Sequence, residues 1–217
     1  MTNYIAPSLL SADKNDLENE ILKVEKLGAE YIHWDVMDGI FVPNKSYTPE
    51  QVKEFAKCHN MVNDVHIMVS DPKYWAPIFR EAGADIVTFH LEAVDCPKCL
   101  AKIVDDLHSH GCKAGISIKP GTKVKSVLPF LEMFDLVLVM SVEPGKGGQK
   151  FMPNALKKIK KLRKFVDKKH LNCLIEVDGG INGETGPLCR KAGADILVAG
   201  SYLYGHEDIK ERMESLR

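Results

Sequence analysis

Short apolar runs and longer segments with helical spacing alternate eight times along the chain. The short runs are rich in β-branched residues and have no clean polar face, which is typical of parallel strands buried on both sides. They predict strands at 5–9, 31–37, 65–69, 86–90, 114–118, 136–140, 174–177 and 196–199. The segments between them predict helices at 14–27, 49–58, 73–82, 98–110, 123–133, 154–168, 184–192 and 206–216.

One helix-to-strand junction recurs three times, as 27–30 (LGAE), 82–85 (AGAD) and 192–195 (AGAD). A glycine just past a helix end accepts the left-handed backbone conformation that stops many helices. Strict alternation of strand and helix predicts a parallel sheet. Eight such units in 217 residues predict one α/β domain over residues 1–217, a (β/α)8 TIM barrel. An open doubly wound sheet is the alternative.

Composition narrows the class of protein. Lys and Arg total 29 and Asp and Glu total 30, a net charge of -1 that argues against a nucleic-acid partner. The longest apolar runs, such as 136–140, are too short to span a membrane, and the first residues do not resemble a signal peptide, so a cytoplasmic protein is expected. Six cysteines make no dense disulfide framework and predict free thiols, with Cys96 and Cys99 a fortuitous pair at a helix start.

Polar residues gather at the carboxyl ends of the predicted strands, where the active sites of barrels lie. Alternation along a strand places His33 and Asp35 on one face, which we expect to point into the barrel with His66 and Asp178. Any one of these histidines alone is better explained as a hydrogen-bonded core residue. Two imidazoles and two carboxylates together suit Zn²⁺, Fe²⁺, Mn²⁺ or Co²⁺, because buried acids must be paired or bound to metal.

Other polar residues occupy the same strand ends. Ser8 lies at the end of the first strand, and His90 and Glu92 lie at the end of the fourth. Glu176 shares the predicted inward face of Asp178 but has no partner that the sequence identifies.

Glycine-bearing loops follow the last three predicted strands. They contain Gly145, Lys146, Gly147 and Gly148, then Gly179 and Gly180, then Gly200 and Ser201. Each glycine alone is explained by a tight turn. Three such loops on one rim predict a phosphate site, because glycine lets backbone N–H groups approach an anion closely.

The chain resembles the ribulose-phosphate 3-epimerase family from end to end. The matching segments are 6–13 (APSLLSAD), 33–39 (HWDVMDG), 41–44 (FVPN), 66–69 (HIMV), 140–142 (MSV), 144–145 (PG), 147–149 (GGQ), 177–181 (VDGGI) and 199–201 (AGS). The resemblance implies a ribulose-phosphate-binding barrel that interconverts D-ribulose 5-phosphate and D-xylulose 5-phosphate in the pentose phosphate pathway. It also implies a homodimer or homohexamer.

The resemblance implies roles for individual residues. One divalent metal ion per subunit would lie on His33, Asp35, His66 and Asp178, and Asp35 and Asp178 would be the acid/base pair on opposite faces of the substrate. The implied substrate-binding residues are Ser8, His66, Gly145, Lys146, Gly147, Gly148, Asp178, Gly179, Gly180, Gly200 and Ser201, and Met37, Met68 and Met140 would cover the intermediate. Two carboxylates suit this chemistry independently, since inverting a carbon beside a ketone needs a proton removed on one face and restored on the other.

Three departures from the family pattern concern the loops. Lys146 replaces the usual aromatic residue, Glu143 replaces a common Asn, and 45–49 differs from the usual loop. The alternatives are an epimerase of a related ketose phosphate such as allulose 6-phosphate, a phosphate-binding barrel lyase or decarboxylase, and a phosphosugar-binding module without catalysis.

Overall fold

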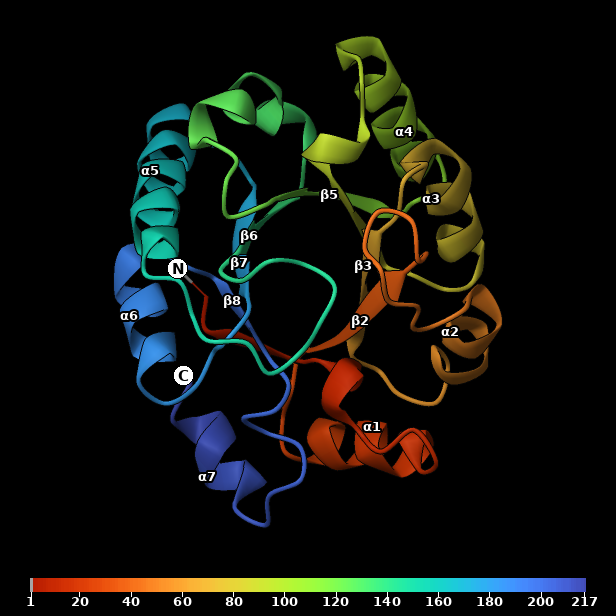
Figure 1. The fold of residues 1–217 in the computed structure, drawn as a ribbon, viewed down its shortest axis with the longest axis vertical. Helices are drawn as coiled ribbons and strands as arrows, with labels where there is room; N and C mark the ends of the chain where they lie inside the picture. Colours follow the sequence, from red (N-terminus) through yellow and green to blue (C-terminus); the bar gives the residue numbers. More distant parts are fainter. Residues whose placement is uncertain (1) are drawn as a thin grey trace.

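The eight predicted strands form one parallel sheet that curls into a barrel. The structure is a computed structural model that describes residues 2–217. The strands lie in the order β1-β8-β7-β6-β5-β4-β3-β2, and a parallel bridge between Ser8 and His33 joins the two ends. Figure 1 shows the strands as a ring with the helices outside it, so the TIM barrel is confirmed and the open sheet is excluded. The strands are β1 (Tyr4–Pro7), β2 (Tyr31–Met37), β3 (Val62–Met68), β4 (Ile86–His90), β5 (Lys113–Ile118), β6 (Leu136–Met140), β7 (Leu174–Asp178) and β8 (Ile196–Ala199).

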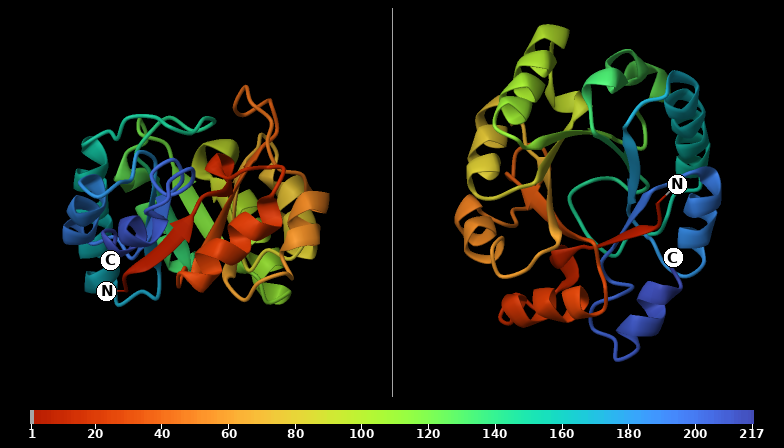
Figure 2. Two further views of the ribbon diagram at one scale, coloured as in Figure 1. Left: turned by 90° about the horizontal axis from the view of Figure 1, so that it is seen from below. Right: turned by 180° about the vertical axis from the view of Figure 1, so that it is seen from behind.

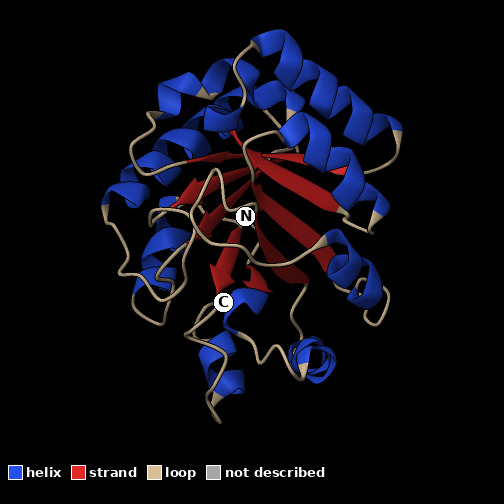
Figure 3. Cartoon of the chain, turned by 45° about the vertical axis from the view of Figure 1, so that its right-hand side comes forward, coloured by secondary structure: helices blue, strands red, loops and turns tan. Residues whose placement is uncertain are grey.

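Seven α-helices of the described chain surround the sheet, as Figure 3 shows in blue. They are α1 (Leu17–Lys26), α2 (Pro49–Phe55), α3 (Pro72–Glu81), α4 (Pro97–Ser109), α5 (Asn154–Lys169), α6 (Thr185–Ala192) and α7 (Ile209–Glu214). Short 3-10 turns, η1 (Leu9–Ser11) and η2 (Leu91–Ala93), follow β1 and β4. Local sequence explains the helix starts: Thr48 and Gln51 form a reciprocal capping box at α2, and Asp71 accepts the N–H of Tyr74 at α3.

The predicted helix at 123–133 is wrong. Two 3-10 helices, η3 (Val124–Ser126) and η4 (Leu128–Met133), occupy this segment instead. Pro129 lies in the first turn of η4 and has no N–H to donate to the carbonyl of Lys125, so a continuous α-helix would lose a bond at its centre.

The recurring junction has the predicted geometry. Gly28, Gly83 and Gly193 have φ values of 86°, 108° and 111°, all in the left-handed region. Each ends a helix and turns the chain directly into the next strand. The repeated motif is therefore the device that returns the chain from an outer helix to the barrel.

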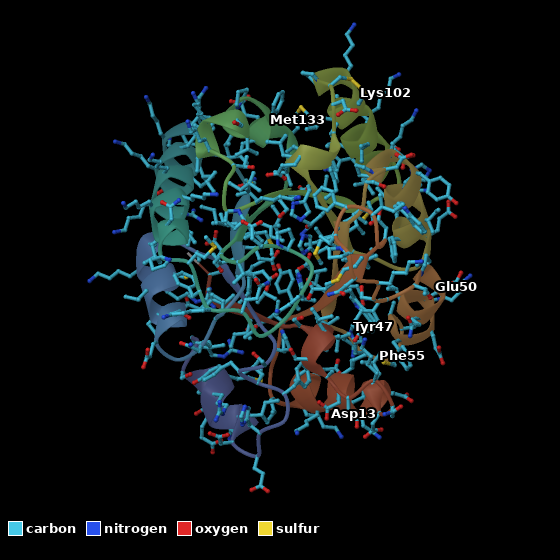
Figure 4. The ribbon with its side chains drawn as sticks, viewed as in Figure 1. Asp13, Tyr47, Glu50, Phe55, Lys102 and Met133 are labelled. Carbon is cyan, nitrogen blue, oxygen red and sulfur yellow. A yellow bond between two sulfur atoms is a disulfide. The ribbon has the colours of Figure 1, made fainter. Side chains whose placement is uncertain are left out.

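Side chains on β2 divide between two environments, as alternation predicts. Ile32, Trp34 and Val36 pack outward into the main apolar core beneath the helices. His33 and Asp35 point into the barrel and are almost completely buried. Figure 4 shows side chains filling the interior of the ring, so the barrel is packed rather than open.

The prediction of free thiols is wrong for two of the six cysteines. Cys96 and Cys99 form a disulfide at the start of α4, where their Cα atoms lie 5.2 Å apart. Cys96 is the N-cap, and its sulfur accepts the N–H of Cys99, so the first helical turn itself brings the two side chains together. The free cysteines are Cys58, Cys112, Cys173 and Cys189. Within residues 2–217, none of the helices has the length and apolar character needed to cross a membrane.

Two long loops rise from the carboxyl end of the barrel, after β2 and after β6, coloured orange and teal in the left view of Figure 2. The amide of Asn44 in the first loop donates a hydrogen bond of 2.7 Å to the carbonyl of Gly145 in the second. Val42 packs so closely against Gly145 that a Cβ there would lie 2.9 Å from it. The two loops thus support each other above the barrel mouth.

Candidate active site

Four side chains from three strands converge at the carboxyl end of the barrel. His33 and Asp35 come from β2, His66 from β3 and Asp178 from the end of β7. One ligand atom from each lies within 4.8 Å of the others. Oδ1 of Asp35 is 3.5 Å from Nε2 of His33 and 3.4 Å from Nδ1 of His66.

The two imidazole nitrogens that face this centre are unpaired. Nε2 of His33 and Nδ1 of His66 are buried and have no hydrogen-bond partner within residues 2–217. Buried polar atoms normally have partners, so two orphaned nitrogens that face one carboxylate oxygen indicate a missing ligand. The residues present therefore fit a divalent ion with nitrogen and oxygen ligands.

A carboxylate behind His33 determines which nitrogen faces the centre. Nδ1 of His33 lies 2.5 Å from Oδ2 of Asp64 on β3, so Nδ1 keeps its proton and Nε2 is the nitrogen that a metal would bind. Sequence reasoning missed Asp64 because the predicted strand began at 65. The signal was present, since Asp64 stands two residues before His66 and shares its inward face.

The acids and imidazoles of the site influence one another's ionisation. Burial opposes ionisation of Asp35, but the nearby imidazoles of His33 and His66 outweigh it and hold the pKa of its carboxyl well below the usual value. Burial also opposes protonation of His33, but Asp64 and Asp35 outweigh it and raise the pKa of the imidazole. Ser8 donates a hydrogen bond of 2.7 Å to Oδ2 of Asp35, which stabilises the same ionised form.

The two acids on β7 behave differently from Asp35. Burial and then the charge of Asp35 raise the pKa of Asp178 to about 7. Burial and then the charge of Asp64 raise the pKa of Glu176 well above its usual value. The predicted inward position of Glu176 is confirmed, and its neighbour is His33, 3.8 Å away. Burial therefore favours the neutral form of Glu176 beneath the site.

A cavity lies directly above the four side chains. Asp35 and Asp178 line it, whereas His33 and His66 have no exposed side-chain surface and lie behind them. The other predicted residues in its wall are Ser8, Met37, Met68, Met140, Gly145, Lys146, Gly147, Gly148, Gly179, Gly180, Gly200 and Ser201. The structure also adds residues that were not predicted, among them Ser11, Val142 and Gln149.

The glycine-bearing loops meet on one side of this cavity. No hydrogen bond within residues 2–217 uses the backbone N–H of Gly148, Gly180 or Ser201. Gln149 holds the first loop in shape, because its amide donates to the carbonyls of Glu143 and Lys146. Free N–H groups on adjacent loops are the usual protein ligands of a phosphate.

Solved structures with the same fold include a 3-hexulose-6-phosphate synthase, with a TM-score of 0.70, 23% identity and coverage of 100% of this chain and 98% of that one. A 3-keto-L-gulonate-6-phosphate decarboxylase from Vibrio cholerae gives a TM-score of 0.75 at 15% identity, with coverage of 100% and 96%. At this identity the likeness shows the fold alone.

Sequence relatives are much closer. The enzyme named ribulose-phosphate 3-epimerase from Bacillus subtilis is 46% identical over 214 residues, covering 98% of this chain and 97% of its own. The protein of that name from Mycobacterium tuberculosis is also 46% identical, covering 98% and 91%. The ribulose-phosphate 3 epimerase family pattern matches residues 4–204. The chain therefore belongs to the ribulose-phosphate 3-epimerase family.

Proposed function

We propose that this member of the family interconverts D-ribulose 5-phosphate and D-xylulose 5-phosphate, with Asp35 and Asp178 as the acid/base pair. One observation carries the proposal: two carboxyls from different strands face one cavity above two orphaned imidazole nitrogens. One carboxyl is held ionised, and the pKa of the other is raised to about 7. A site that only binds a sugar phosphate needs no such pair of proton carriers.

The two carboxylate oxygens of Asp35 have different neighbours. Oδ1 faces His33 and His66, whereas Oδ2 accepts the hydroxyl of Ser8. Oδ2 is thus the oxygen available to accept the proton from C3 of the substrate. Asp178 then donates a proton to the other face of the carbon, and in the reverse reaction the two acids exchange roles.

A divalent ion on His33, Asp35, His66 and Asp178, which we propose to be Zn²⁺, Fe²⁺, Mn²⁺ or Co²⁺, would supply positive charge to stabilise the enediolate. Met37, Met68 and Met140 are buried side chains of the cavity wall and exclude water from this intermediate. The N–H groups of Gly148, Gly180 and Ser201 bind the substrate phosphate.

We further propose that the whole chain acts as one domain, since a single sheet surrounds the site. We propose a cytoplasmic location because most cysteines are free thiols, and a homodimer or homohexamer on the strength of the resemblance alone.

The test is anaerobic purification with elemental analysis, followed by an assay of D-ribulose 5-phosphate conversion before and after chelation. Activity should disappear with the metal and return when it is restored, while the fold persists because the barrel core does not depend on one ion. A metal-free sample with full activity would refute the site. Relative turnover of allulose 6-phosphate separates the pentose-phosphate assignment from that of a six-carbon ketose phosphate.

A further inference from the structure

A buried chain of three side chains runs outward from the site on the side of β4. Nε2 of His66 lies 2.9 Å from Nε2 of His90, and Nδ1 of His90 lies 3.3 Å from Oε2 of Glu92. Both imidazoles have no exposed side-chain surface, and the side chain of Glu92 is 22% exposed. These three side chains therefore connect a candidate metal ligand to the edge of the protein.

We propose that His90 and Glu92 are positioning residues that fix the tautomer and orientation of His66, so that its Nδ1 presents a lone pair to the metal. This inference rests on the proposed function only through the metal site, and it assigns to His90 and Glu92 no contact with substrate.

The direction of each hydrogen bond follows from the charge of Glu92, the outermost of the three side chains. An ionised Glu92 can only accept, so Nδ1 of His90 must carry a proton and donate it. Nε2 of His90 is then the acceptor, and Nε2 of His66 must be the donor. Nδ1 of His66 is left without a proton, and this is the orphaned nitrogen that faces Asp35.

Glu92 is held as an acceptor by its other oxygen. Oε1 accepts the backbone N–H of Lys119 at 2.9 Å and the hydroxyl of Thr122. Burial opposes ionisation, but the hydrogen bonds from His90, Thr122 and Lys119 outweigh it and lower the pKa of Glu92 to about 2. The same carboxylate therefore anchors the loop after β5 and orients His90.

Packing around His90 leaves the ring few alternatives. The ring of Phe41 lies against it, with centroids 4.8 Å apart, and the ammonium of Lys119 lies 3.8 Å from the centroid of Phe41. These groups cover His90 on the side of the loop after β2. A water molecule in place of the His90 side chain would lack this packing and would not fix the direction of the hydrogen bond to His66.

The two candidate histidine ligands are thus supported in different ways. His33 faces the centre with Nε2 and is held by the carboxylate of Asp64 directly, whereas His66 faces it with Nδ1 and is held through the neutral spacer His90. Such second-layer partners usually change metal affinity by roughly 10–100-fold when they are lost.

The experiment measures Zn²⁺ affinity by chelator competition, without substrate, in wild type, Glu92→Gln and His90→Phe. The amide introduced by Glu92→Gln cannot accept from both His90 and the loop after β5, and the phenyl ring introduced by His90→Phe keeps the packing but removes the acceptor of His66. Each variant should raise the Zn²⁺ dissociation constant by roughly 10–100-fold. Nitrogen NMR of the zinc-loaded wild type should show Nδ1 of His90 protonated and Nε2 unprotonated.

Thr122→Val is the matched control, because it removes one bond to Glu92 and loosens the loop but leaves the bond to His90. It should bind Zn²⁺ as wild type does. Equal losses in Thr122→Val and Glu92→Gln, or wild-type affinity in a folded Glu92→Gln, would overturn the inference, and Glu92→Gln decides the matter if His90→Phe does not fold. A wild type that binds Zn²⁺ but has no epimerase activity would refute the proposed function and leave this inference standing.

Discussion

The hydroxyl of Ser8 donates a hydrogen bond of 2.7 Å to Oδ2 of Asp35, next to the bridge that closes the barrel between β1 and β2. This hydrogen bond links the strand pair that closes the barrel to the carboxylate that we propose as the base. It also explains why a serine at the end of the first strand belongs to the site, since its side chain stabilises the ionised carboxylate on the oxygen turned away from the imidazoles.

Ser8→Ala should lower kcat by roughly tenfold or more, because a hydrogen bond to a charged group contributes about 1.5–3 kcal/mol. Zn²⁺ affinity should change little, since Oδ1 of Asp35 keeps its position. Ser11→Ala is the control, because Ser11 lines the same cavity and makes no hydrogen bond to either acid in the described chain. Steady-state kinetics that show equal losses in kcat for both variants would contradict the assignment.

Metal binding should depend on pH with a definite sign. The pKa of Asp178 in the folded, metal-free protein is about 7, above its ordinary value of 3.8. Between these two values the folded state holds a proton that the unfolded state has lost, so the free energy of unfolding should fall as pH rises from about 4 to about 7. Binding a metal must release that proton, and affinity should therefore rise over the same range.

Thermal unfolding of the metal-free protein and titration calorimetry in buffers of different ionisation enthalpy test this dependence. The raised pKa of His33 should also make the free energy of unfolding fall at higher pH. The stabilising charge of its imidazole is lost as pH rises through that pKa. Asp178→Asn should flatten the lower part of the stability curve. An unchanged slope in that variant would assign the effect to other groups.

Much of this site could be predicted from the sequence, because it depends on the alternation of side chains within a strand and on residues at strand ends. Alternation along β2 places His33 and Asp35 on the inward face, and the barrel rule places Asp178 and the glycine loops on one rim. The contacts between neighbouring strands could not be predicted. Asp64 was outside the predicted strand, and the position of Glu176 beside His33 depends on how the barrel closes. Local sequence signals for the broken helix at Pro129 and for the Cys96–Cys99 disulfide were present. The helical periodicity of 123–133 and the low cysteine content instead led to the predictions of a continuous helix and of free thiols.

Two glycines of the proposed phosphate site should respond differently to substitution. A Cβ at Gly180 would lie 2.5 Å from the backbone nitrogen of Phe151, whereas a Cβ at Gly148 would meet nothing within 4 Å. Gly180→Ala should therefore lower the melting temperature and raise KM, because the loop must move. Gly148→Ala carries only the cost of its positive φ, about 1 kcal/mol.

A larger residue at Gly148 should obstruct the phosphate without disturbing the fold. Gly148→Leu should raise KM while lowering the melting temperature no more than Gly148→Ala does, and inorganic phosphate should inhibit this variant less than wild type. If Gly148→Leu binds substrate and phosphate as wild type does, the phosphate lies elsewhere.

Lys146 is an exposed residue of the cavity wall. Its charge should attract the substrate phosphate, and salt should screen that attraction. Lys146→Phe should therefore raise KM most at low ionic strength, while kcat stays near wild type. A KM ratio between variant and wild type that is independent of salt would identify Lys146 as a solvated surface residue.

The two-acid mechanism makes a specific demand on isotopes. Asp35 and Asp178 serve opposite faces of C3, so the proton removed is not the one returned unless the two acids exchange it internally. In deuterated water the product should gain deuterium at C3, measured by proton NMR in both directions. Asp35→Asn and Asp178→Asn should each cost more than the roughly 10²–10⁴-fold typical of one acid/base group, because each also removes a proposed metal ligand.

Reloading each variant with metal separates the two effects. A metal-loaded Asp178→Asn protein keeps the base Oδ2 of Asp35, and should exchange the C3 hydrogen of one epimer with solvent without inverting the carbon. Asp35→Asn should do the same for the other epimer. Wild-type inversion with complete retention of the substrate's own hydrogen in both directions would require one base or a direct internal transfer. In that case Asp35 and Asp178 would not be opposed partners, and the raised pKa of Asp178 would reflect only its burial beside Asp35.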